Sequence, residues 1–354
     1  MKKTLTRSIT AAAVLATVSL GLTACSSSDS GSKGGVGVSL IVKTTSNPFF
    51  VAMENGAKKA AKADGVDLTI AAGKEDGDED TQIQAIENAI SRGDKGILIT
   101  PNGPGVVDAI NKARDAGLYV IALDTPPDPA DAVDITFATD NFEAGNLIGK
   151  WTAGQLGGKK ATIALLDLFD DKVVTVDYNR DQGFLSGLGI DTVNDKKNGD
   201  EAKSGTYSGG DYTIVGNEAT QGAEDGGRTA METLLSKNGD INVVYTINEP
   251  AAYGAYQALK AAGKKDVLIV SVDGGCAGVK QVGDGIIGAT SQQYPVKMAE
   301  LGVKAIKKLA DGGAKPKTSG DLDFFNTGVQ LVTDKAVDGV TSIDSAAGSK
   351  VCWG

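Results

Sequence analysis

From Val36 onward, a short apolar run followed by a helix-like stretch recurs roughly every 25–30 residues. The first unit is "VGVSLIVK" followed by "FFVAMENGAKKAAKADG", where the apolar residues have helical spacing and a glycine ends the pattern. The apolar runs are continuous rather than alternating, which is typical of parallel strands covered by helices on both faces. The repeated unit therefore predicts an α/β fold.

The units form two series, which predict two doubly wound parallel-sheet lobes. The first series ends at "YVIALD", and the second runs from "FEAGNLIGKWTAGQLGG" to "VLIVSVD". Later elements, such as "VKMAELGVKAIKKLADGG" and "TGVQLVT", exceed what the second lobe needs and favour a hinge crossed several times. We expect lobe one to hold residues 36–139 plus 294–325, and lobe two residues 140–293 plus 326–354. The polar, glycine-rich segment Asp195 to Asp211 predicts a surface loop.

The N-terminus has the pattern of an export signal. A basic "MKKTLTR" precedes a 15-residue stretch that is too short to span a bilayer comfortably. The stretch ends in "LTAC", which resembles a bacterial lipobox, and the alternative is an ordinary cleaved signal followed by a chance cysteine. We expect a signal peptide at residues 1–24, a lipidated Cys25 and a Ser/Gly tether at residues 25–35. The body is then predicted to work outside the cytoplasm, anchored to the cell membrane.

This location affects the two remaining cysteines, Cys276 and Cys352. An oxidising compartment permits them to pair, so we expect a disulfide that holds the C-terminal "KVCWG" onto the body. The alternative is two buried free thiols.

Composition excludes several classes of function. The net charge of -10 argues against a nucleic-acid partner. The absence of histidine excludes serine–histidine triads and histidine zinc sites. No phosphate-binding P-loop, nucleophile elbow or dinucleotide fingerprint occurs, and we expect no cofactor and no metal.

Two acidic stretches each have two interpretations. Asp76 to Glu87 resembles a calcium loop, but Thr81 stands where the sharp turn needs glycine, so an acidic helix start is favoured. Asp167 to Asp171 offers a carboxylate pair for catalysis, although acids after a strand more often cap a helix or face solvent.

Polar side chains end five of the expected strands. In open α/β sheets, ligands bind outside the carboxyl ends of the strands. Each such residue alone is typical of a turn, but together they predict a polar cleft for a small, neutral, hydroxyl-rich ligand. Without a histidine base or a metal cluster, binding without turnover is favoured. The residues are Lys43, Asn102, Asp124, Asn248 and Asp273.

The ordered motifs resemble those of sugar-binding proteins of ABC importers, of the ribose-binding type. The motifs are the lipobox, "VSLIVKTTSNPFF", "VIALDT", "YNRDQGF", "YTINEPAAYGAYQALKAAG", "LIVSVDGG" and "IGATSQQYP". The resemblance runs from about Val36 to Val337 and implies the periplasmic-binding-protein-like fold of type I. Within that group, "INEPAAYGAYQAL", "VSVDGGCAGV" and "KVCWG" look most like fructose-binding lipoproteins.

The resemblance also implies which residues bind the sugar. It places Phe49 and Phe50 on the sugar ring and Gln293 at the lobe junction. The other implied contacts are Lys43, Asn47 and Asp124 from lobe one, and Tyr178, Arg180, Asn248 and Asp273 from lobe two. Three alternatives remain: Phe50 as a core residue, Asp273 as a helix cap and Arg180 as a surface residue.

The chain departs from the ribose-binding pattern in three places. Thr125 stands where ribose binders have arginine, Lys43 occupies a position that is usually small and hydroxylic, and an aromatic residue is missing near Thr220 to Gly222. These departures argue against simple ribose specificity and are compatible with a differently shaped ketose or hexose.

The leading hypothesis is therefore a lipid-anchored, monomeric sugar receptor without enzymatic activity. It would capture a monosaccharide, with fructose favoured, and deliver it to a membrane ABC permease with its ATPase. The alternatives are a sugar or signal-molecule sensor that partners a membrane receptor, and a cell-envelope glycosidase.

Overall fold

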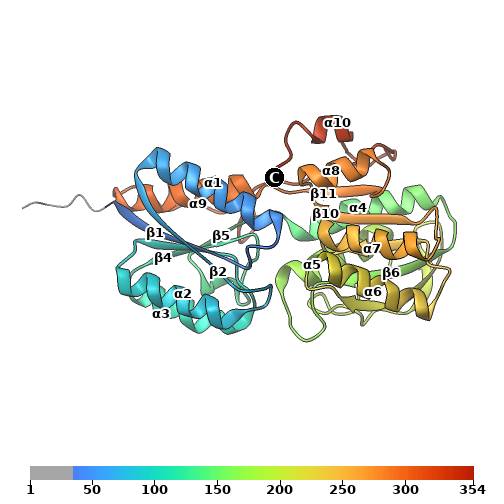
Figure 1. Ribbon diagram of the computed structural model, residues 1–354, viewed down its shortest axis with the longest axis horizontal. Helices are drawn as coiled ribbons and strands as arrows, with labels where there is room; N and C mark the ends of the chain where they lie inside the picture. Colours follow the sequence, from blue (N-terminus) through green and yellow to red (C-terminus); the bar gives the residue numbers. More distant parts are fainter. Residues whose placement is uncertain (1–34) are drawn as a thin grey trace, which may run out of the picture. The chain divides into compact units, whose positions relative to one another are not determined.

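The computed structural model describes residues 35–354, which form two α/β lobes (Figure 1). Each lobe is built on one sheet: a six-stranded sheet in the order β12-β5-β4-β3-β1-β2, and a seven-stranded sheet in the order β13-β11-β10-β9-β6-β8-β7, both counted within the described residues. The predicted α/β fold with two doubly wound lobes is confirmed. The signal peptide, Cys25 and nearly all of the tether fall outside the described residues.

Lobe one has helices on both faces of its sheet. Neighbouring strand residues point to opposite faces, so Leu40 packs with helices α1 and α9 whereas Ile41 packs with α2 and α3. In Figure 1, the orange α9 lies beside the blue α1 although the two helices are far apart in the sequence. The strands are β1 (Val36–Val42), β2 (Val66–Ala72), β3 (Gly96–Ile99), β4 (Tyr119–Leu123), β5 (Ile135–Ala138) and β12 (Phe325–Asn326); the helices are α1 (Pro48–Asp64), α2 (Glu79–Arg92), α3 (Val107–Asp115) and α9 (Pro295–Ala310).

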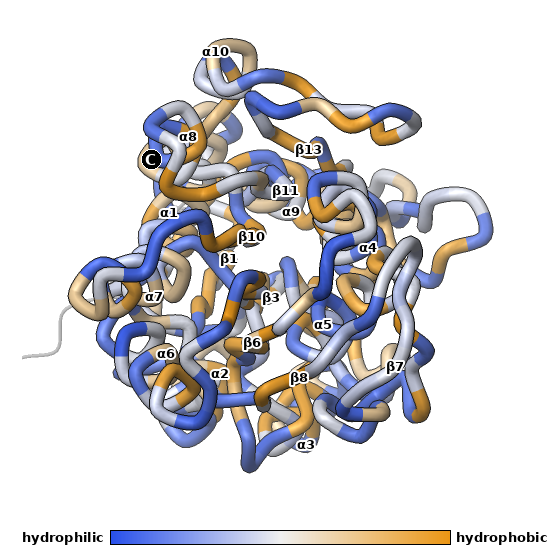
Figure 2. Tube along the Cα trace, turned by 90° about the vertical axis from the view of Figure 1, so that its right-hand side faces the viewer, coloured by the Kyte–Doolittle hydropathy of each residue, from blue (hydrophilic) through white to orange (hydrophobic). Residues whose placement is uncertain are grey.

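Lobe two repeats this layering. Ile163 and Leu165 pack with α4 and α5, and Ala164 and Leu166 pack with α6 and α7. In Figure 2, the hydrophobic orange colour marks strands such as β6 and β10. The strands are β6 (Ala161–Asp167), β7 (Ser204–Tyr207), β8 (Gly210–Ala219), β9 (Val243–Thr246), β10 (Leu268–Asp273), β11 (Ala289–Gln292) and β13 (Gln330–Val332); the helices are α4 (Asn141–Leu156), α5 (Thr175–Leu188), α6 (Glu224–Lys237), α7 (Glu249–Ala261), α8 (Cys276–Gly283) and α10 (Ser345–Gly348).

Two edge strands differ from the purely parallel pattern. Strand β7 pairs antiparallel with β8, and β13 pairs antiparallel with β11. The prediction of a loop from Asp195 to Asp211 was therefore wrong for Ser204–Tyr207, which forms β7, and for Gly210 and Asp211, which begin β8. A two-residue turn at Ser208 and Gly209 allows this hairpin, and Gly209 has a positive φ of 114°.

Within the described residues, the chain passes between the two sheets after β5, after β11 and after β12. These segments are joined to one another, because the amide of Thr327 donates to the carbonyl of Ala138 (2.8 Å) and the hydroxyl of Thr139 donates to the carbonyl of Gly328 (3.3 Å). This arrangement is the predicted multi-crossing hinge. No helix in residues 35–354 has the length and apolar character needed to span a membrane.

Candidate functional site

Nine of the eleven sequence-predicted ligand residues line one cavity between the lobes, with a volume of about 30 Å³. They come from the carboxyl ends of the strands and the first turns of the following helices, where open α/β sheets bind ligands. The nine are Lys43, Asn47, Phe49, Phe50, Asp124, Arg180, Asn248, Asp273 and Gln293; the cavity is completed by Asp76, Leu168, Val176 and Ile247.

The paired phenylalanines lie at the first turn of α1. Asn47 caps this helix by accepting a hydrogen bond from the amide of Phe49 (2.9 Å), and Pro48 occupies the first helical position. The rings of Phe49 and Phe50 meet edge to face with centroids 5.3 Å apart. Both rings line the cavity and also belong to the lobe-one core. The alternative of a core Phe50 and the proposed ligand role are therefore compatible.

A buried ion pair forms one wall of the cavity in lobe one. Nζ of Lys43 lies 3.7 Å from Oδ1 of Asp76, and the two side chains are only 2% and 8% exposed. Burial raises the pKa of Asp76, and the charge of Lys43 works against that increase. The carboxylate of Asp76 thus holds the charged end of Lys43 inside the cavity. This partner accounts for a long cationic side chain at a position where ribose binders usually have a small hydroxylic residue.

Asp124 and Arg180 connect the lobes. Nη2 of Arg180 lies 3.7 Å from Oδ1 of Asp124, and Nε donates to Oδ1 of Asn141 (2.8 Å). Nη1 of Arg180 donates to the carbonyl of Ile247 (2.9 Å). Arg180 is 4% exposed, so the alternative of a surface arginine was wrong. The hydroxyl of Thr125 donates to Oδ2 of Asp124 (2.8 Å), which leaves Oδ1 free to face Arg180 and the cavity.

Asp273 and Gln293 form the opposite wall. Nε2 of Gln293 donates to Oδ1 of Asp273 (2.8 Å), and the amide of Glu249 donates to Oδ2 (3.4 Å). Burial raises the pKa of Asp273 to about 6, while the charge of Arg180 lowers it. Helix α8 begins after Gly275 without a side-chain cap, so the alternative of Asp273 as its cap was wrong.

Asn248 lines the cavity but also caps α7. Its Oδ1 accepts from the amide of Ala251 (3.1 Å), and its Nδ2 donates to the carbonyl of Gly222 (2.9 Å). An amide retains one lone pair and one N–H after these two bonds, so Asn248 still has limited capacity for a ligand.

Three buried acceptors around this cavity have no hydrogen-bond partner among residues 35–354. They are Oδ1 of Asp76, Oδ1 of Asp124 and Oε1 of Gln293. Because buried polar atoms are normally paired, these atoms indicate a ligand that brings hydroxyl donors. Lys43 and Arg180 add cationic donors beside them.

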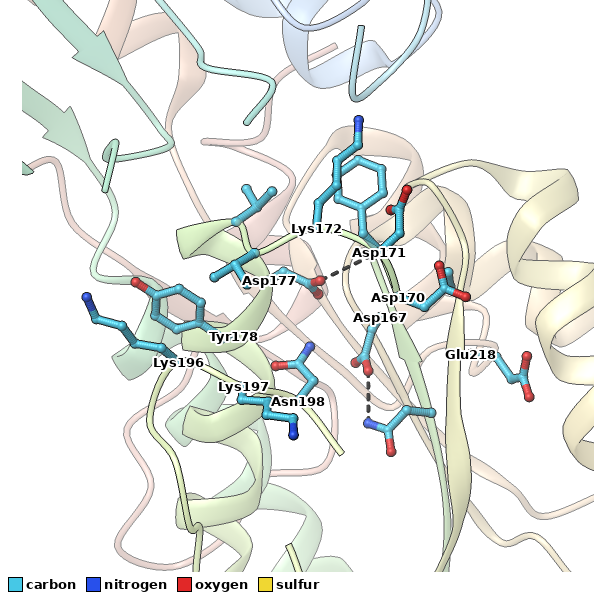
Figure 3. A pocket seen from close by; sticks show the side chains of 15 residues that line it. Asp167, Asp170, Asp171, Lys172, Asp177, Tyr178, Lys196, Lys197, Asn198 and Glu218 are labelled. Carbon is cyan, nitrogen blue, oxygen red and sulfur yellow. Dashed lines mark hydrogen bonds between the residues drawn. The ribbon is translucent and has the colours of Figure 1, made fainter. Parts of the chain in front are cut away.

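The remaining two predicted residues lie elsewhere. Asn102 is saturated by its surroundings: Nδ2 donates to the carbonyls of Lys43 (3.3 Å) and Asp78 (3.0 Å), and Oδ1 accepts from the amide of Gly77 (2.9 Å). It therefore orders the loop that carries Asp76. Tyr178 lines a separate cavity of about 370 Å³ in which Asp167 to Lys172 form one side (Figure 3).

Asp78 and Asp167, one acid from each of these two stretches, have structural partners, as does the nearby Asp177. Asp78 caps α2 by accepting from the amide of Thr81 (3.1 Å), and hydrogen bonds from Lys74 and Thr81 lower its pKa to about 2. The favoured acidic helix start is therefore confirmed. Asp167 accepts from Asn217 (2.9 Å), and Asp177 accepts from the amides of Leu168 and Phe169. Within the described residues, no group of three or more acidic or cysteine side chains is arranged to hold a metal ion.

Sequence reasoning missed two residues of the site. Asp76 follows β2 by four residues and lines the cavity. It was missed because it lies in an acidic stretch that was interpreted as the start of a helix. Asn141 begins α4 just after the first hinge crossing, and it holds both Arg180 and the carbonyl of Asp124 (3.4 Å). The rule that ligand residues follow the carboxyl ends of strands identifies Asp76 if the search continues past Gly73, the glycine after β2. No feature of the local sequence identifies Asn141.

Away from the cavity and the hinge, three polar contacts join the lobes. Nζ of Lys172 donates to the carbonyl of Gly77 (2.8 Å), and the hydroxyl of Thr175 donates to the carbonyl of Pro126 (2.6 Å). Lys196 forms an ion pair with Asp128 (3.1 Å). The cavity holds little more than a water-sized molecule, so a larger ligand requires these contacts to open. A wider groove of about 800 Å³ shares Asn47, Asp76 and Asp273 with the cavity and offers a way in.

The C-terminal segment lies beside the same wall. The sulfur atoms of Cys276 and Cys352 are bonded, with Cα atoms 5.0 Å apart. This places "KVCWG" at the N-terminus of α8, as expected for a tail held onto the body.

Residues 38–314 match a family of proteins described as the periplasmic binding protein domain. The chain belongs to this family. The ribose import binding protein of Bacillus subtilis is 28% identical over 318 residues, covering 87% of this chain and 95% of that protein. An Agrobacterium vitis ABC transporter solute-binding protein with bound D-fucose is 26% identical, with a TM-score of 0.70 and coverage of 86% of this chain and 97% of that one. A Mycobacterium smegmatis protein in complex with β-D-fucofuranose is 26% identical, with a TM-score of 0.68 and coverage of 80% and 88%.

These findings confirm the resemblance to binding proteins of the ribose type. They also support a non-enzymatic role, because the relatives of this periplasmic binding protein are named as binding proteins. Membership of the family implies a location outside the cytoplasm.

Proposed function

We propose that this periplasmic binding protein captures a neutral monosaccharide in the cavity between its lobes and delivers it to a membrane ABC permease. The observation that carries the proposal is a set of buried acceptors on Asp76, Asp124 and Gln293 that lack a hydrogen bond within the described residues. Those of Asp76 and Asp124 each lie 3.7 Å from a cation, Lys43 and Arg180 respectively. Sugar hydroxyls donate to such acceptors and accept from such cations. The rings of Phe49 and Phe50 supply apolar surface for the C–H face of a sugar.

Fructose is our first candidate for the ligand. The preference rests on the resemblance of the α7, α8 and C-terminal motifs to fructose-binding lipoproteins. The geometry is compatible with it, because three aliphatic side chains, Leu168, Val176 and Ile247, line the lobe-two side of the cavity beside its polar residues. The buried Lys43–Asp76 pair also offers polar contacts that a small hydroxylic residue does not.

Delivery requires the lobes to open and close. A sugar that contacts both lobes favours the closed form, because only that form brings Asp124 and Arg180 together around it. The inter-lobe contacts of Lys172, Thr175 and Lys196 belong to the tighter arrangement with the small cavity, and they loosen when the lobes close around a sugar. We propose that the permease recognises this form, and that a lipid on Cys25 keeps the monomeric receptor at the membrane surface.

Isothermal titration calorimetry with fructose, ribose, xylose, glucose, galactose and inositol tests the capture step. We expect one sugar to bind with a Kd well below millimolar and fructose to be the tightest. The matched variant is Asp124→Asn, which removes one unpaired acceptor and should weaken binding of that sugar. If no sugar in the panel binds below millimolar, the proposal fails.

The delivery step needs a separate measurement. Permease and ATPase reconstituted in lipid vesicles should hydrolyse ATP faster when the sugar-loaded protein is added. A sensor would instead leave ATP hydrolysis unchanged. Mass measurement of the N-terminal peptide from membranes should find a diacylglycerol-modified Cys25, and an unmodified or missing Cys25 would contradict the anchor.

A further inference from the structure

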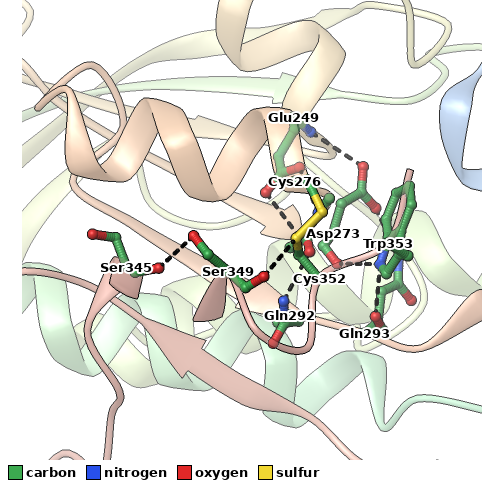
Figure 4. The surroundings of a disulfide bond; sticks show 11 residues. Glu249, Asp273, Cys276, Gln292, Gln293, Ser345, Ser349, Cys352 and Trp353 are labelled. Atoms are coloured by element: carbon green, nitrogen blue, oxygen red, sulfur yellow. Dashed lines mark hydrogen bonds between the residues drawn. A yellow bond between two sulfur atoms is a disulfide. The ribbon is translucent and has the colours of Figure 1, made fainter. Parts of the chain in front are cut away.

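The side chain of Trp353 lies against Asp273 and Gln293, two residues that line the cavity between the lobes (Figure 4). It is buried, and its ring meets Phe49 edge to face with centroids 5.4 Å apart. Phe49 belongs to lobe one and lines the cavity, whereas Trp353 itself does not line it. Trp353 lines the wider groove that leads to the cavity, so its effect on a sugar held inside the cavity acts through its neighbours.

The indole N–H of Trp353 reaches two more cavity residues. Nε1 donates to the carbonyl of Gln293 (2.8 Å) and shares its hydrogen with the carbonyl of Asp273 (3.3 Å). These carbonyls belong to the two residues whose side chains form the lobe-two wall, and Asp273 has an unusual backbone φ of 147°. A non-glycine residue at such a φ persists only where its surroundings hold it.

The tail that carries Trp353 is fixed to lobe two. Cys352 is bonded to Cys276, the first residue of α8. The amide of Cys276 donates to the carbonyl of Trp353 (2.9 Å), and Gly275 forms a parallel bridge with Trp353. A side chain attached to lobe two thus packs on a ring of lobe one at the edge of the cleft.

We propose that Trp353 is a positioning residue of the sugar site, which rests on the proposed function. It holds the backbone of Asp273 and Gln293 in place, and it supports Phe49 from behind when the lobes are closed. The covalent link between Cys276 and Cys352 fixes the position of Trp353. Loss of either the ring or the link weakens sugar binding without removing any group that touches the sugar.

Substitutions at Trp353 separate its two contacts. Trp353→Phe keeps an aromatic ring against Phe49 and loses both hydrogen bonds, whereas Trp353→Ala loses all three contacts. We expect the Kd for the sugar to rise roughly tenfold or more in Trp353→Ala and by a smaller factor in Trp353→Phe. The matched control is Trp151→Phe, because Trp151 is a buried tryptophan whose Nε1 donates to the carbonyl of Lys335 (2.7 Å) in lobe two, away from the cavity. Its Kd should equal that of the unaltered protein.

The Trp151→Phe protein also provides a spectroscopic readout, because the chain has two tryptophans and Trp353 then emits alone. We expect its emission to change on addition of sugar, with a midpoint equal to the calorimetric Kd. Without sugar, acrylamide should quench this emission weakly in the disulfide-bonded protein and strongly after reduction, and Cys276→Ser/Cys352→Ser should behave like the reduced protein.

Each result has a defined meaning. Unchanged Kd values in both Trp353 variants, in a protein that binds sugar, overturn the positioning role and leave the proposed function intact. Strong acrylamide quenching of Trp353 in the disulfide-bonded protein overturns its inferred buried position, whether or not the protein binds a sugar. If the unaltered protein binds no sugar, the proposed function fails and the positioning role fails with it. Thermal melting of each variant ensures that Kd values are compared between folded proteins.

Discussion

Asp124 and Asp273 end corresponding strands in the two lobes, and both have a positive backbone φ, 63° and 147°. Such conformations are costly for residues other than glycine and gather at binding and active sites. In both cases the strained residue turns its carboxylate into the inter-lobe cavity, one facing Arg180 and the other bonded to Gln293. Each lobe thus places one aspartate carboxylate in the cavity from a residue with positive backbone φ at the end of a strand.

Arg180→Ala should remove most of the sugar affinity. The guanidinium contacts Asp124, Asn141 and the carbonyl of Ile247, and charged hydrogen bonds of this kind contribute most when buried. We expect the Kd to rise by roughly 100-fold or more. Calorimetry measures it, with the exposed Arg228→Ala in lobe two as the control that should bind normally. An Arg180→Ala protein that is folded and binds within threefold of normal (a limit of roughly 0.7 kcal/mol) would contradict this role.

Asp76→Asn tests the residue that the sequence did not reveal. The change keeps the shape of the side chain and removes the partner charge of the buried Lys43. We expect the Kd to rise roughly tenfold, because one charged acceptor is lost and Lys43 remains buried without its counter-charge. Asp80→Asn, in the exposed first turn of α2, should bind as the unaltered protein does. Equal affinities for Asp76→Asn and Asp80→Asn would exclude Asp76 from the site.

Phe49→Ala should affect both binding and stability. The sequence pattern favours a ring reserved for ligand, whereas the structure packs Phe49 against Phe50 and Trp353 in the lobe-one core. Loss of a buried aromatic ring costs about 3–5 kcal/mol of unfolding free energy, and the sugar loses an apolar surface as well. We expect more than roughly tenfold weaker binding together with a lower Tm, and smaller losses of both in Phe49→Leu. The control is Phe142→Ala, because Phe142 is exposed. Full sugar affinity in a folded Phe49→Ala protein would show that the ring of Phe49 serves the core and not the ligand.

Sugar affinity should fall as the pH is lowered through about 6. Burial raises the pKa of Asp273 to about 6, and its charged neighbours are Glu249, Arg180 and Asp124. The carboxylate accepts hydroxyl hydrogen bonds at two oxygens, and protonation removes part of that capacity. Calorimetry from pH 5 to pH 8 should show this trend, and it should be absent in Asp273→Asn.

The stability of the sugar-free protein should change in the opposite direction. The pKa of Asp273 is higher in the folded protein than its ordinary value of 3.8, so the folded state holds the proton more tightly. Its contribution to stability is fully present below pH 3.8 and is lost as the pH rises through about 6. Denaturant titrations should show less pH dependence in Asp273→Asn than in the unaltered protein over this window. A steeper dependence in the variant would contradict the assignment.

The sequence predicted the layers of the fold well, because buried parallel strands leave continuous apolar runs such as "VSLIVK". It also located most cavity residues, because the strand-end rule and the family motifs agree at Asp124 and Asp273. It placed Asn102 in the site, since a strand-end amide looks the same whether it meets a ligand or the backbone of a neighbouring loop. That distinction depends on the position of residues 76–78, which is set by tertiary packing.

Tyr178 was also predicted to contact the sugar, but it does not line the inter-lobe cavity. It stands two residues before Arg180 on α5, and residues two apart on a helix face different directions. Arg180 points into the inter-lobe cavity, whereas Tyr178 borders the separate cavity of lobe two. The short hairpin strand β7 was missed because three of its four residues, Ser204 to Thr206, are exposed and carry no apolar signal.

The placement of α9 has a consequence for how the chain acquires its structure during synthesis. The α1 face of the lobe-one sheet is covered in part by Met298, Val303 and Ile306 of α9, which follow all of the lobe-two elements from α4 to β11 in the sequence. Lobe one therefore leaves the ribosome with part of this apolar face uncovered, and its core cannot be completed until α9, which ends at Ala310 of 354 residues, and β12 have been made. Early folding of the N-terminal half is disfavoured, so lobe one acquires its core only together with the second half of the chain.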